Sequence, residues 1–358
     1  MHKKLFIPGP TEVAPEVLAK MATPMIGHRS KDASTLQHEI SDKLRQVMRT
    51  KNPIVLSTSS GSGLMEGSIR SLTAKRAIVF SVGAFGNRWF KMAEANNVPA
   101  DKHEAEWGHP TTPEVVEKYL STGKYDVMTV THNETSTGIM NPVGEIAEVK
   151  KKYPDVLWLL DTVSSMAGTK IDVDELGVDV CITSTQKALA LPPGMAIASV
   201  SPRALEHGKQ VKYRGWYLDI LELYKYVDTK DYQYSATPSL SHMFAMNFQL
   251  DRILAEGLER RYARHTEMAE YTRAWAKRHF ALYPEERHAS VTLTTITNTT
   301  GFSVKALNDA LGKLGMQISN GYGDLKEKTF RIAHMGELTL ADVKEVTAAI
   351  EKILPSLK

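Results

Sequence analysis

Short, continuously apolar runs that alternate with helical patterns restrict the fold of this sequence more than any other feature. The runs cover residues 53–57, 77–81, 126–131, 156–161, 178–183 and 195–200. Their lack of polar alternation is typical of strands that are buried on both faces of a sheet. Helical patterns follow several runs, but the last two leave no room for a crossover helix between them. We therefore predict an α/β fold: a mostly parallel central sheet, flanked by helices, with at least one antiparallel strand.

The pattern changes after about Ser239, which indicates a second, smaller unit. A long helical stretch from His242 toward Phe280 precedes a strand-like run, a helix, a strand near 330–332 and a closing helix. This succession is typical of a small α+β unit. We place the boundary inside the long helix. Residues 1–257 then form an N-terminal segment and a large domain, and residues 258–358 form a small C-terminal domain.

The chain has 358 residues but only one cysteine, Cys181. One cysteine excludes an intrachain disulfide, a four-cysteine zinc site and a four-cysteine iron–sulfur cluster, and we expect no metal site. It also favours a reducing compartment, so we expect a cytoplasmic location. The 44 Lys and Arg nearly balance the 41 Asp and Glu, and no basic block indicates nucleic-acid binding. No apolar stretch is long enough to span a membrane.

Glycines and hydroxyls after the first apolar run predict a phosphate site. Residues 57–67 read STSSGSGLMEG and lead into a helix, whose free N–H groups and dipole favour an anion. Gly61, Gly63 and Gly67 are spaced too widely for the dinucleotide fingerprint, and no acidic residue ends the next strand. A single phosphate group therefore fits better, although a simple turn with a helix N-cap would have the same composition.

Three more side chains follow strands at the edge where ligands bind in open α/β sheets. Phe85 can stack on a planar ring, or it can simply pack in the core. Asp161 ends an apolar strand, where a carboxylate needs a cation or hydrogen-bond donors to stay charged; a turn or N-cap aspartate is the alternative. Lys187 lies between an apolar strand and a Pro-Pro-Gly turn, which favours a lowered pKa and nucleophilic chemistry over an ordinary surface lysine.

Together these features fit one cofactor, pyridoxal 5′-phosphate, which has a phosphate, a planar ring, a pyridine nitrogen and an aldehyde. Asp161 would keep the pyridine nitrogen protonated, so that the ring withdraws electrons from the substrate. Lys187 would form the Schiff base and move the proton between the substrate α-carbon and the cofactor. The large domain, residues 1–257, is thus expected to bind the cofactor.

Nine short motifs recur in a spacing that matches a known family. They are PGPT (8–11), GHRS (27–30), SGS (60–62), GAFG (83–86), THNETSTG (131–138), DTVSS (161–165), STQKA (184–188), YLDI (217–220) and FRIAHMG (330–336). In this combination the chain resembles, over essentially its whole length, the class V aminotransferases of the fold-type I pyridoxal-phosphate enzymes. It is most similar to their alanine–glyoxylate and serine–pyruvate branch. Many of these relatives carry Trp where Phe85 stands; Phe still stacks but lacks the indole N–H.

The resemblance implies a transaminase that moves an amino group from alanine or serine to glyoxylate or pyruvate by a ping-pong mechanism. It also implies a homodimer with shared active sites. Lys187 would be the Schiff-base lysine and Asp161 the partner of the pyridine nitrogen. The resemblance further implies that the cofactor ring is contacted by Phe85 on one face, by Val163 on the opposite face and by Thr135 at its hydroxyl group. It implies that the phosphate is bound by Ser60, Gly61, Ser62 and Gln186, and that Tyr234 and Thr237 of a neighbouring subunit complete this site. It also implies substrate contacts by Gly9 and by Arg331, whose planar fork suits a carboxylate.

Other members of the same fold remain as alternatives. A phosphoserine or 2-aminoethylphosphonate aminotransferase would need extra cations for a second phosphate or phosphonate, and His28, Arg29 and Arg214 are candidates. A cysteine desulfurase-type lyase would need a reactive cysteine on a mobile loop, whereas Cys181 lies in a predicted buried strand. A catalytically silent scaffold is disfavoured because the predicted lysine, aspartate and arginine are all present.

Overall fold

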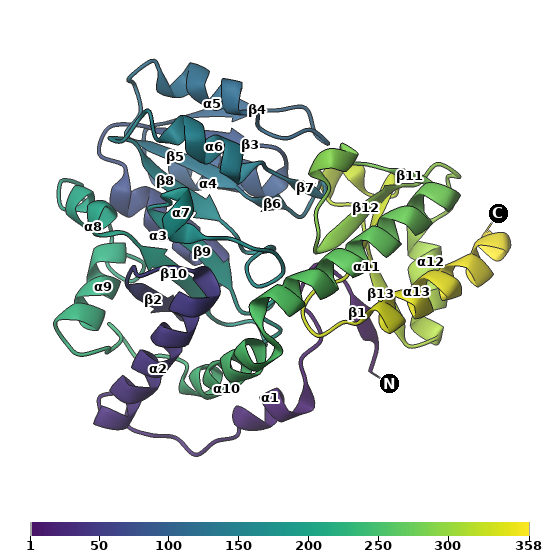
Figure 1. The fold of residues 1–358 in the computed structure, drawn as a ribbon, viewed down its shortest axis with the longest axis horizontal. Helices are drawn as coiled ribbons and strands as arrows, with labels where there is room; N and C mark the ends of the chain where they lie inside the picture. The colour runs from purple at the N-terminus through teal and green to yellow at the C-terminus, as the bar shows by residue number, and fades with distance from the viewer. Residues whose placement is uncertain (1, 358) are drawn as a thin grey trace.

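A seven-stranded sheet forms the centre of the larger part of the molecule in the computed structural model, which describes residues 2–357 (Figure 1). In spatial order the strands are β2 (Ile54–Ser57), β10 (Ala196–Val200), β9 (Val180–Ser184), β8 (Leu157–Asp161), β5 (Val127–Thr131), β3 (Ala77–Ser81) and β4 (Ala100–Glu104). Strand β10 is antiparallel to both of its neighbours, and all other pairs are parallel. The predicted fold class is therefore confirmed.

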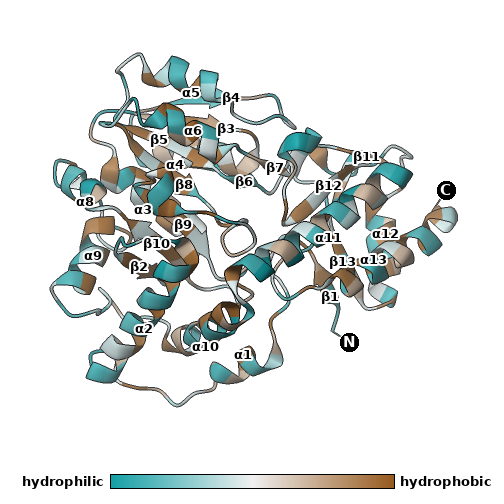
Figure 2. Ribbon diagram, viewed as in Figure 1, coloured by the Kyte–Doolittle hydropathy of each residue, from teal (hydrophilic) through white to brown (hydrophobic). Residues whose placement is uncertain are grey.

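Helices cover both faces of this sheet, which explains why its strands are apolar throughout. One face packs on α2 (Lys31–Met48), α5 (Pro113–Leu120), α6 (Val143–Lys150) and α10 (Leu240–Glu256). The other face packs on α3 (Gly61–Leu72), α4 (Ala84–Ala95), α8 (Pro202–Gly208) and α9 (Ile220–Asp228). Figure 2 shows hydrophobic residues gathered on the strands, with hydrophilic residues on the outer faces of the helices. Two short helices, α1 (Pro15–Lys20) and α7 (Val173–Leu176), add the buried side chains of Val17 and Val173 to the core on the first face.

A second, five-stranded sheet forms the core of the smaller part of the molecule. Its strands, in spatial order, are β1 (Lys4–Phe6), β13 (Met316–Asn320), β14 (Thr329–Ala333), β12 (Leu293–Thr297) and β11 (Ala281–Leu282). Helices α11 (Leu258–His279), α12 (Val304–Lys313) and α13 (Leu340–Ile353) pack against it. The N-terminal strand β1 pairs with β13, so this sheet includes residues that the sequence grouped with the large domain. The domain division at residue 257 stays a prediction.

The long helix predicted from His242 toward Phe280 is two helices, α10 and α11, that meet at Gly257. Gly257 has φ +83, a left-handed conformation that glycine adopts at little cost and that interrupts the helical hydrogen bonds. Because of this break, α10 packs on the large sheet while α11 packs on the small one. The helical periodicity continues on both sides of the break, which is why the sequence predicts one helix.

Strand β4 was not predicted from the sequence because its residues, ADKHE, are mostly polar. It lies at the edge of the sheet, where only one side pairs with a neighbour, and its residues are partly exposed. Within residues 2–357, no helix is both long enough and apolar enough to cross a lipid bilayer.

Candidate active site

A cavity of about 140 Å³ lies at the carboxyl ends of the parallel strands, where the predicted site residues meet. Its walls are Ser60, Gly61, Ser62, Met65, Phe85, Arg88, Asn133, Thr135, Asp161, Val163, Ser164, Ser184, Gln186 and Lys187. These residues come from the ends of β8 and β9, from the segments that follow β2, β5, β8 and β9, and from the first two turns of α3 and α4. All predicted cofactor-binding residues except Tyr234 and Thr237 are therefore brought to one place.

Lys187 follows β9 and is covered by the N-terminal segment of the chain. Its Nζ donates a hydrogen bond to the carbonyl oxygen of Pro8, and its own carbonyl accepts from Thr11 Oγ1 at 3.0 Å. Gly9 has φ +114, and a Cβ at that position would lie 2.7 Å from Lys187 Cδ. Only glycine can therefore occupy this position without displacing the lysine side chain.

The pKa values of the two central ionisable groups are both shifted by burial. Burial lowers the pKa of Lys187 to about 8; Arg331 and Arg88 lower it further, and Asp161 opposes them. Burial raises the pKa of Asp161, which is 3% exposed, to about 7. Both shifts disfavour the charged forms, as expected for ionisable groups moved away from water.

Asp161 is oriented by its own turn. Its Oδ1 accepts a hydrogen bond from the Val163 N–H at 2.8 Å, which partly offsets the effect of burial on the pKa. The neighbouring buried carboxyl of Glu134 acts the other way and raises the pKa of Asp161. A carboxylate in this position keeps its charge only when a cation or a strong donor approaches from the cavity.

The first turn of α3 forms the end of the cavity that suits a phosphate. Ser60 is the N-cap residue, yet its hydroxyl makes no capping bond and stays available. A Cβ on Gly61 would lie 2.6 Å from Val163 Cγ2, so the close approach of the helix to the Asp161 turn requires glycine. Ser184 Oγ and Gln186 Oε1 are buried at the cavity wall without a hydrogen-bond partner in residues 2–357.

Phe85 is held in the first turn of α4 by Glu134, whose role was not predicted from the sequence. The Phe85 and Gly86 N–H groups donate to Glu134 Oε2 at 2.9 and 3.0 Å, and Ser136 donates to Oε1 from both its N–H and its hydroxyl. The carboxyl group thus satisfies N–H groups that a helix leaves free at its start. Thr135, the residue between them, forms a 2.6 Å hydrogen bond with Ser164 Oγ.

Arg331 projects from β14 beside the cavity and is 8% exposed. Its Nε and Nη2 donate to the carbonyl of Asn320 at 3.1 and 3.0 Å, and its Nη1 donates to the carbonyl of Thr135 at 3.0 Å. These bonds fix the guanidinium plane and leave one N–H on each terminal nitrogen without a partner in the described chain. Burial lowers the pKa of Arg331 to about 10, which still leaves it charged at neutral pH.

Arg88 is a cavity residue that the sequence analysis missed. Its Nη1 donates to Ser62 Oγ at 2.9 Å, and its guanidinium lies 4.6 Å from the centre of the Phe85 ring. It forms no ion pair with any residue of the described chain. Its place one helical turn after Phe85 was a usable signal, because residues three apart on a helix share a face.

Tyr234 and Thr237 are not part of this cavity. The Tyr234 hydroxyl is buried within its own chain and accepts a hydrogen bond from the Thr58 N–H at 2.9 Å, beside the phosphate end. The Thr237 side chain is exposed at the surface. A single chain therefore does not bring these two predicted residues together with the rest.

The cavity residues fit the predicted cofactor. The N-terminus of α3, with the free hydroxyl of Ser60, would hold the phosphate, and Ser184 Oγ, Gln186 Oε1 and Asn133 Oδ1, which have no partner in residues 2–357, offer further polar contacts at the wall. Asp161 supplies a buried carboxylate for a protonated ring nitrogen, and Lys187 supplies an amine with a lowered pKa for the aldehyde.

Cys181 takes no part in this chemistry. It lies in β9, as predicted, and is fully buried, with its Sγ 3.4 Å from Thr162 Oγ1. Burial raises the pKa of the thiol to about 12, so it stays protonated and unreactive.

Comparison with known proteins identifies the family of the chain. Residues 5–324 match the family described as aminotransferase class-V. The chain is 40% identical to an uncharacterised aminotransferase of Methanocaldococcus jannaschii, over 100% of this chain and 94% of the relative. It is 31% identical to L-aspartate–glyoxylate aminotransferase of Paracoccus denitrificans, over 99% and 91%. The crystal structure of alanine–glyoxylate aminotransferase from Nostoc sp. superposes with a TM-score of 0.93 at 29% identity, covering 99% of this chain and 96% of that one. The chain thus belongs to the class V aminotransferases and is a transaminase that depends on pyridoxal phosphate.

Proposed function

We propose that this transaminase moves the amino group of alanine or serine to glyoxylate or pyruvate by a ping-pong mechanism, in which the first product leaves before the second substrate binds. The observation that carries the proposal is the convergence of Lys187 and Asp161 on one cavity, with Arg331 beside it. The names of the Nostoc and Paracoccus relatives support glyoxylate as the amino acceptor.

Pyridoxal phosphate, when bound, supplies an electron sink for the substrate α-carbon. In this chain Ser60, Gly61, Ser62 and Gln186 would hold its phosphate. The ring would lie between Phe85 and Val163, with Thr135 on its hydroxyl group. Asp161 would hold the proton on the ring nitrogen, because its buried carboxylate gains most from a cationic partner.

Lys187 would carry the cofactor and then move the proton from the substrate α-carbon. An amine with a pKa near 8 is largely neutral above that pH and can accept a proton, whereas an ordinary lysine is neutral only above about 10.4. When the Lys187 Nζ is not bonded to the cofactor, it can donate a hydrogen bond to the carbonyl of Pro8. Gly9 leaves the space in which the lysine side chain lies.

Arg331 would orient both substrates by their α-carboxylate groups. Two backbone carbonyls fix its guanidinium, and one N–H on each terminal nitrogen stays free for a paired contact with a carboxylate. The same contact serves an amino acid in one half-reaction and an oxo acid in the other.

We also propose that the enzyme is a homodimer in which Tyr234 and Thr237 of a second copy complete the phosphate site. The exposure of Thr237 and of the aromatic residues Tyr213 and Trp216 supports this arrangement. A cytoplasmic location remains a proposal that rests on the single buried cysteine.

Aspartate is a second candidate as amino donor. Arg88 lines the cavity without an ion-pair partner in the described chain, so it can attract the side-chain carboxylate of an acidic amino acid. The Paracoccus relative is named for aspartate. In contrast, two cations considered for a phosphorylated substrate are engaged elsewhere: Arg29 donates to the carbonyl of Tyr234, and Arg214 pairs with Asp219.

The experiment follows each half-reaction separately. The loaded enzyme is mixed with alanine, serine, aspartate or phosphoserine, and loss of the cofactor's visible absorbance is recorded; the amino form is then mixed with glyoxylate, pyruvate or oxaloacetate. The proposal expects alanine or serine to react fastest and glyoxylate or pyruvate to restore the absorbance. A faster reaction with aspartate would establish aspartate as the amino donor. No reaction with alanine, serine or aspartate would refute both proposed donor classes.

A further inference from the structure

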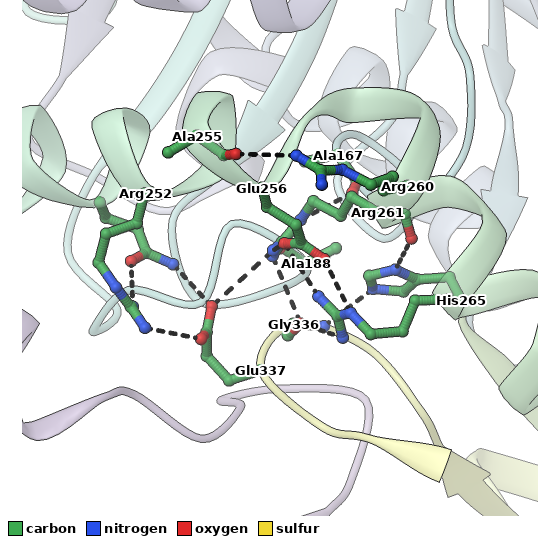
Figure 3. A network of polar contacts seen from close by, with 12 residues as sticks. Ala167, Ala188, Arg252, Ala255, Glu256, Arg260, Arg261, His265, Gly336 and Glu337 are labelled. Carbon is green, nitrogen blue, oxygen red and sulfur yellow. Dashed lines mark hydrogen bonds and ion pairs between the residues drawn. The ribbon is translucent and has the colours of Figure 1, made fainter.

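A network of charged side chains surrounds a buried arginine where α10 and α11 meet the segment that follows β14 (Figure 3). At its centre is Arg261, in the first turn of α11, whose side chain is 1% exposed. Its Nη2 donates to the carbonyl of Ala188 at 2.6 Å, directly after Lys187 in the chain. Its Nε donates to the carbonyl of Ala167 at 3.2 Å. Arg261 therefore binds the backbone of the loop that carries Lys187, which we call the lysine loop.

The first two turns of α11 also bind the backbone that follows Arg331. The carbonyl of Gly336, beyond the end of β14, lies 3.4 Å from Arg261 Nη2 and 3.1 Å from Arg264 Nη1. The Gly336 N–H donates to Nε2 of His265 at 3.1 Å. Nδ1 of His265 donates to the carbonyl of Arg261 at 2.8 Å, which leaves Nε2 free to accept. Burial next to Arg261 keeps the pKa of His265 well below its usual value, so the ring stays neutral.

The two backbone segments also touch each other. Gly336 has φ +75, and a Cβ there would lie 3.2 Å from Ala190 Cβ and 3.6 Å from the carbonyl oxygen of Lys187. Ala188 packs with Ala333 and Met335 in a small buried cluster. Apolar contact alone is non-directional, whereas the hydrogen bonds of Arg261 fix where each carbonyl lies.

The charge of Arg261 is balanced from α10. Its Nη1 lies 2.6 Å from Oε2 of Glu256, whose other oxygen, Oε1, accepts a hydrogen bond from Arg264 Nε at 2.8 Å. Gln249 of the same helix donates to the carbonyl of Leu189 at 3.1 Å and so adds another contact to the lysine loop. A buried guanidinium is costly even when paired, and an apolar side chain would fill the same space at less cost. What an apolar side chain lacks is the ability to bind both carbonyls.

We propose that Arg261 is a positioning residue for transamination, which fixes the separation between Lys187 and Arg331 by binding the backbone that follows each of them to one helix. The proposal rests on the roles proposed above for those two residues. The amine of Lys187 must reach the substrate α-carbon while Arg331 holds the substrate carboxylate. Misplacement of a reacting group by about 1 Å can lower the rate by about 100-fold.

The test compares Arg261→Met with Met268→Ala, a cavity-forming substitution at a fully buried position of the same helix. Arg261→Met is expected to slow the donor half-reaction at saturating amino acid by roughly 10- to 100-fold. Hydrogen exchange of the cofactor-free protein is expected to speed up at Ala190 and Gly336, whose N–H groups bond Lys187 O and His265 Nε2. Met268→Ala should lower the melting temperature while the half-reaction rate stays within about twofold of wild type.

The proposal is overturned if Arg261→Met lowers the melting temperature as Met268→Ala does but leaves the half-reaction rate unchanged. It is also overturned if exchange increases at only one of the two segments. Should Arg261→Met fail to fold, Arg261→Lys serves instead: lysine can pair with Glu256 but cannot bind Ala188 and Gly336 together, so smaller changes of the same kind are expected. The exchange measurement needs neither cofactor nor substrate, so it remains valid even if Lys187→Ala shows that the proposed function is wrong.

Discussion

At the residue scale, burial shifts the pKa values of the two central groups of the cavity in opposite directions. It favours a neutral amine at Lys187 and a protonated carboxyl at Asp161. Without the cofactor, both groups are therefore held in an environment that destabilises their charged forms. A ligand with an aldehyde and a protonated ring nitrogen relieves both, which is the physical reason that the site selects such a cofactor.

Asp161→Asn is expected to stabilise the cofactor-free protein at pH 8 while weakening cofactor binding. The pKa of Asp161 is raised from 3.8 to about 7 in the folded protein. The proton therefore contributes stability that is complete below the ordinary pKa and is lost as pH rises through 7. At about 1.36 kcal/mol per pKa unit, the buried charge costs up to about 4 kcal/mol above pH 7.

Melting temperatures of the two cofactor-free proteins at pH 5 and pH 8 provide the check. The advantage of Asp161→Asn should be larger at pH 8 than at pH 5, and its dissociation constant for pyridoxal phosphate should rise. An advantage that does not change with pH would show that burial does not control this carboxyl group.

At the element scale, the close approach of α3 to the turn after β8 determines where the first turn of α3 lies for binding a phosphate. Gly61→Ala would place a Cβ 2.6 Å from Val163 Cγ2 and so push the first turn of α3 away from the cavity. We expect cofactor affinity to fall about tenfold or more, which corresponds to about 1.4 kcal/mol. The measurement is a titration of the cofactor-free protein with pyridoxal phosphate.

Gly144→Ala is the matched control for this substitution. Gly144 lies in the first turn of α6, and apart from its chain neighbours and the backbone of α6 itself, no atom of the described residues lies within 4 Å of the position that its Cβ would take. It should leave cofactor affinity unchanged. Equal affinities for both variants and the wild type would mean that the packing of α3 on the Asp161 turn does not shape the site.

The elements that the sequence predicted well are those whose signal is local. Continuous apolar runs marked β3, β5 and β8, because strands buried on both faces leave a pattern within themselves. Strand β4 was missed because an edge strand can be polar, and the break at Gly257 was missed because one glycine does not interrupt helical periodicity.

The candidate site shows the same division. Lys187, Asp161 and Phe85 were predicted because each follows a strand, and the topology brings strand ends together. The hydrogen bond from Lys187 Nζ to the carbonyl of Pro8 was not predicted, because it joins residues far apart in the chain. Nor was the binding of Ala188 by Arg261, for the same reason. Contacts of this kind depend on how elements pack and leave no periodic signal.

At the scale of the whole molecule, we expect a second copy of the chain to complete the site. The single chain leaves Thr237 exposed and outside its own cavity, and the resemblance assigns it to the cavity of a neighbouring subunit. We expect light scattering to give twice the 39.8 kDa of one chain at micromolar concentration. Thr237→Arg should weaken cofactor binding by placing a bulky cation at the contact between copies. A monomer that binds the cofactor at full affinity would contradict the shared site.

The central role proposed for Lys187 is to move the proton at the substrate α-carbon. The most direct measurement follows the donor half-reaction of wild type and Lys187→Ala by the absorbance of the bound cofactor. The wild type should lose its visible absorbance with the amino donor and regain it with glyoxylate. Lys187→Ala should retain the fold and bind the cofactor without a covalent link, yet show a half-reaction slowed by about 100-fold or more, in line with the loss of a general acid–base group. A Lys187→Ala enzyme that completes the half-reaction at the wild-type rate would contradict the account.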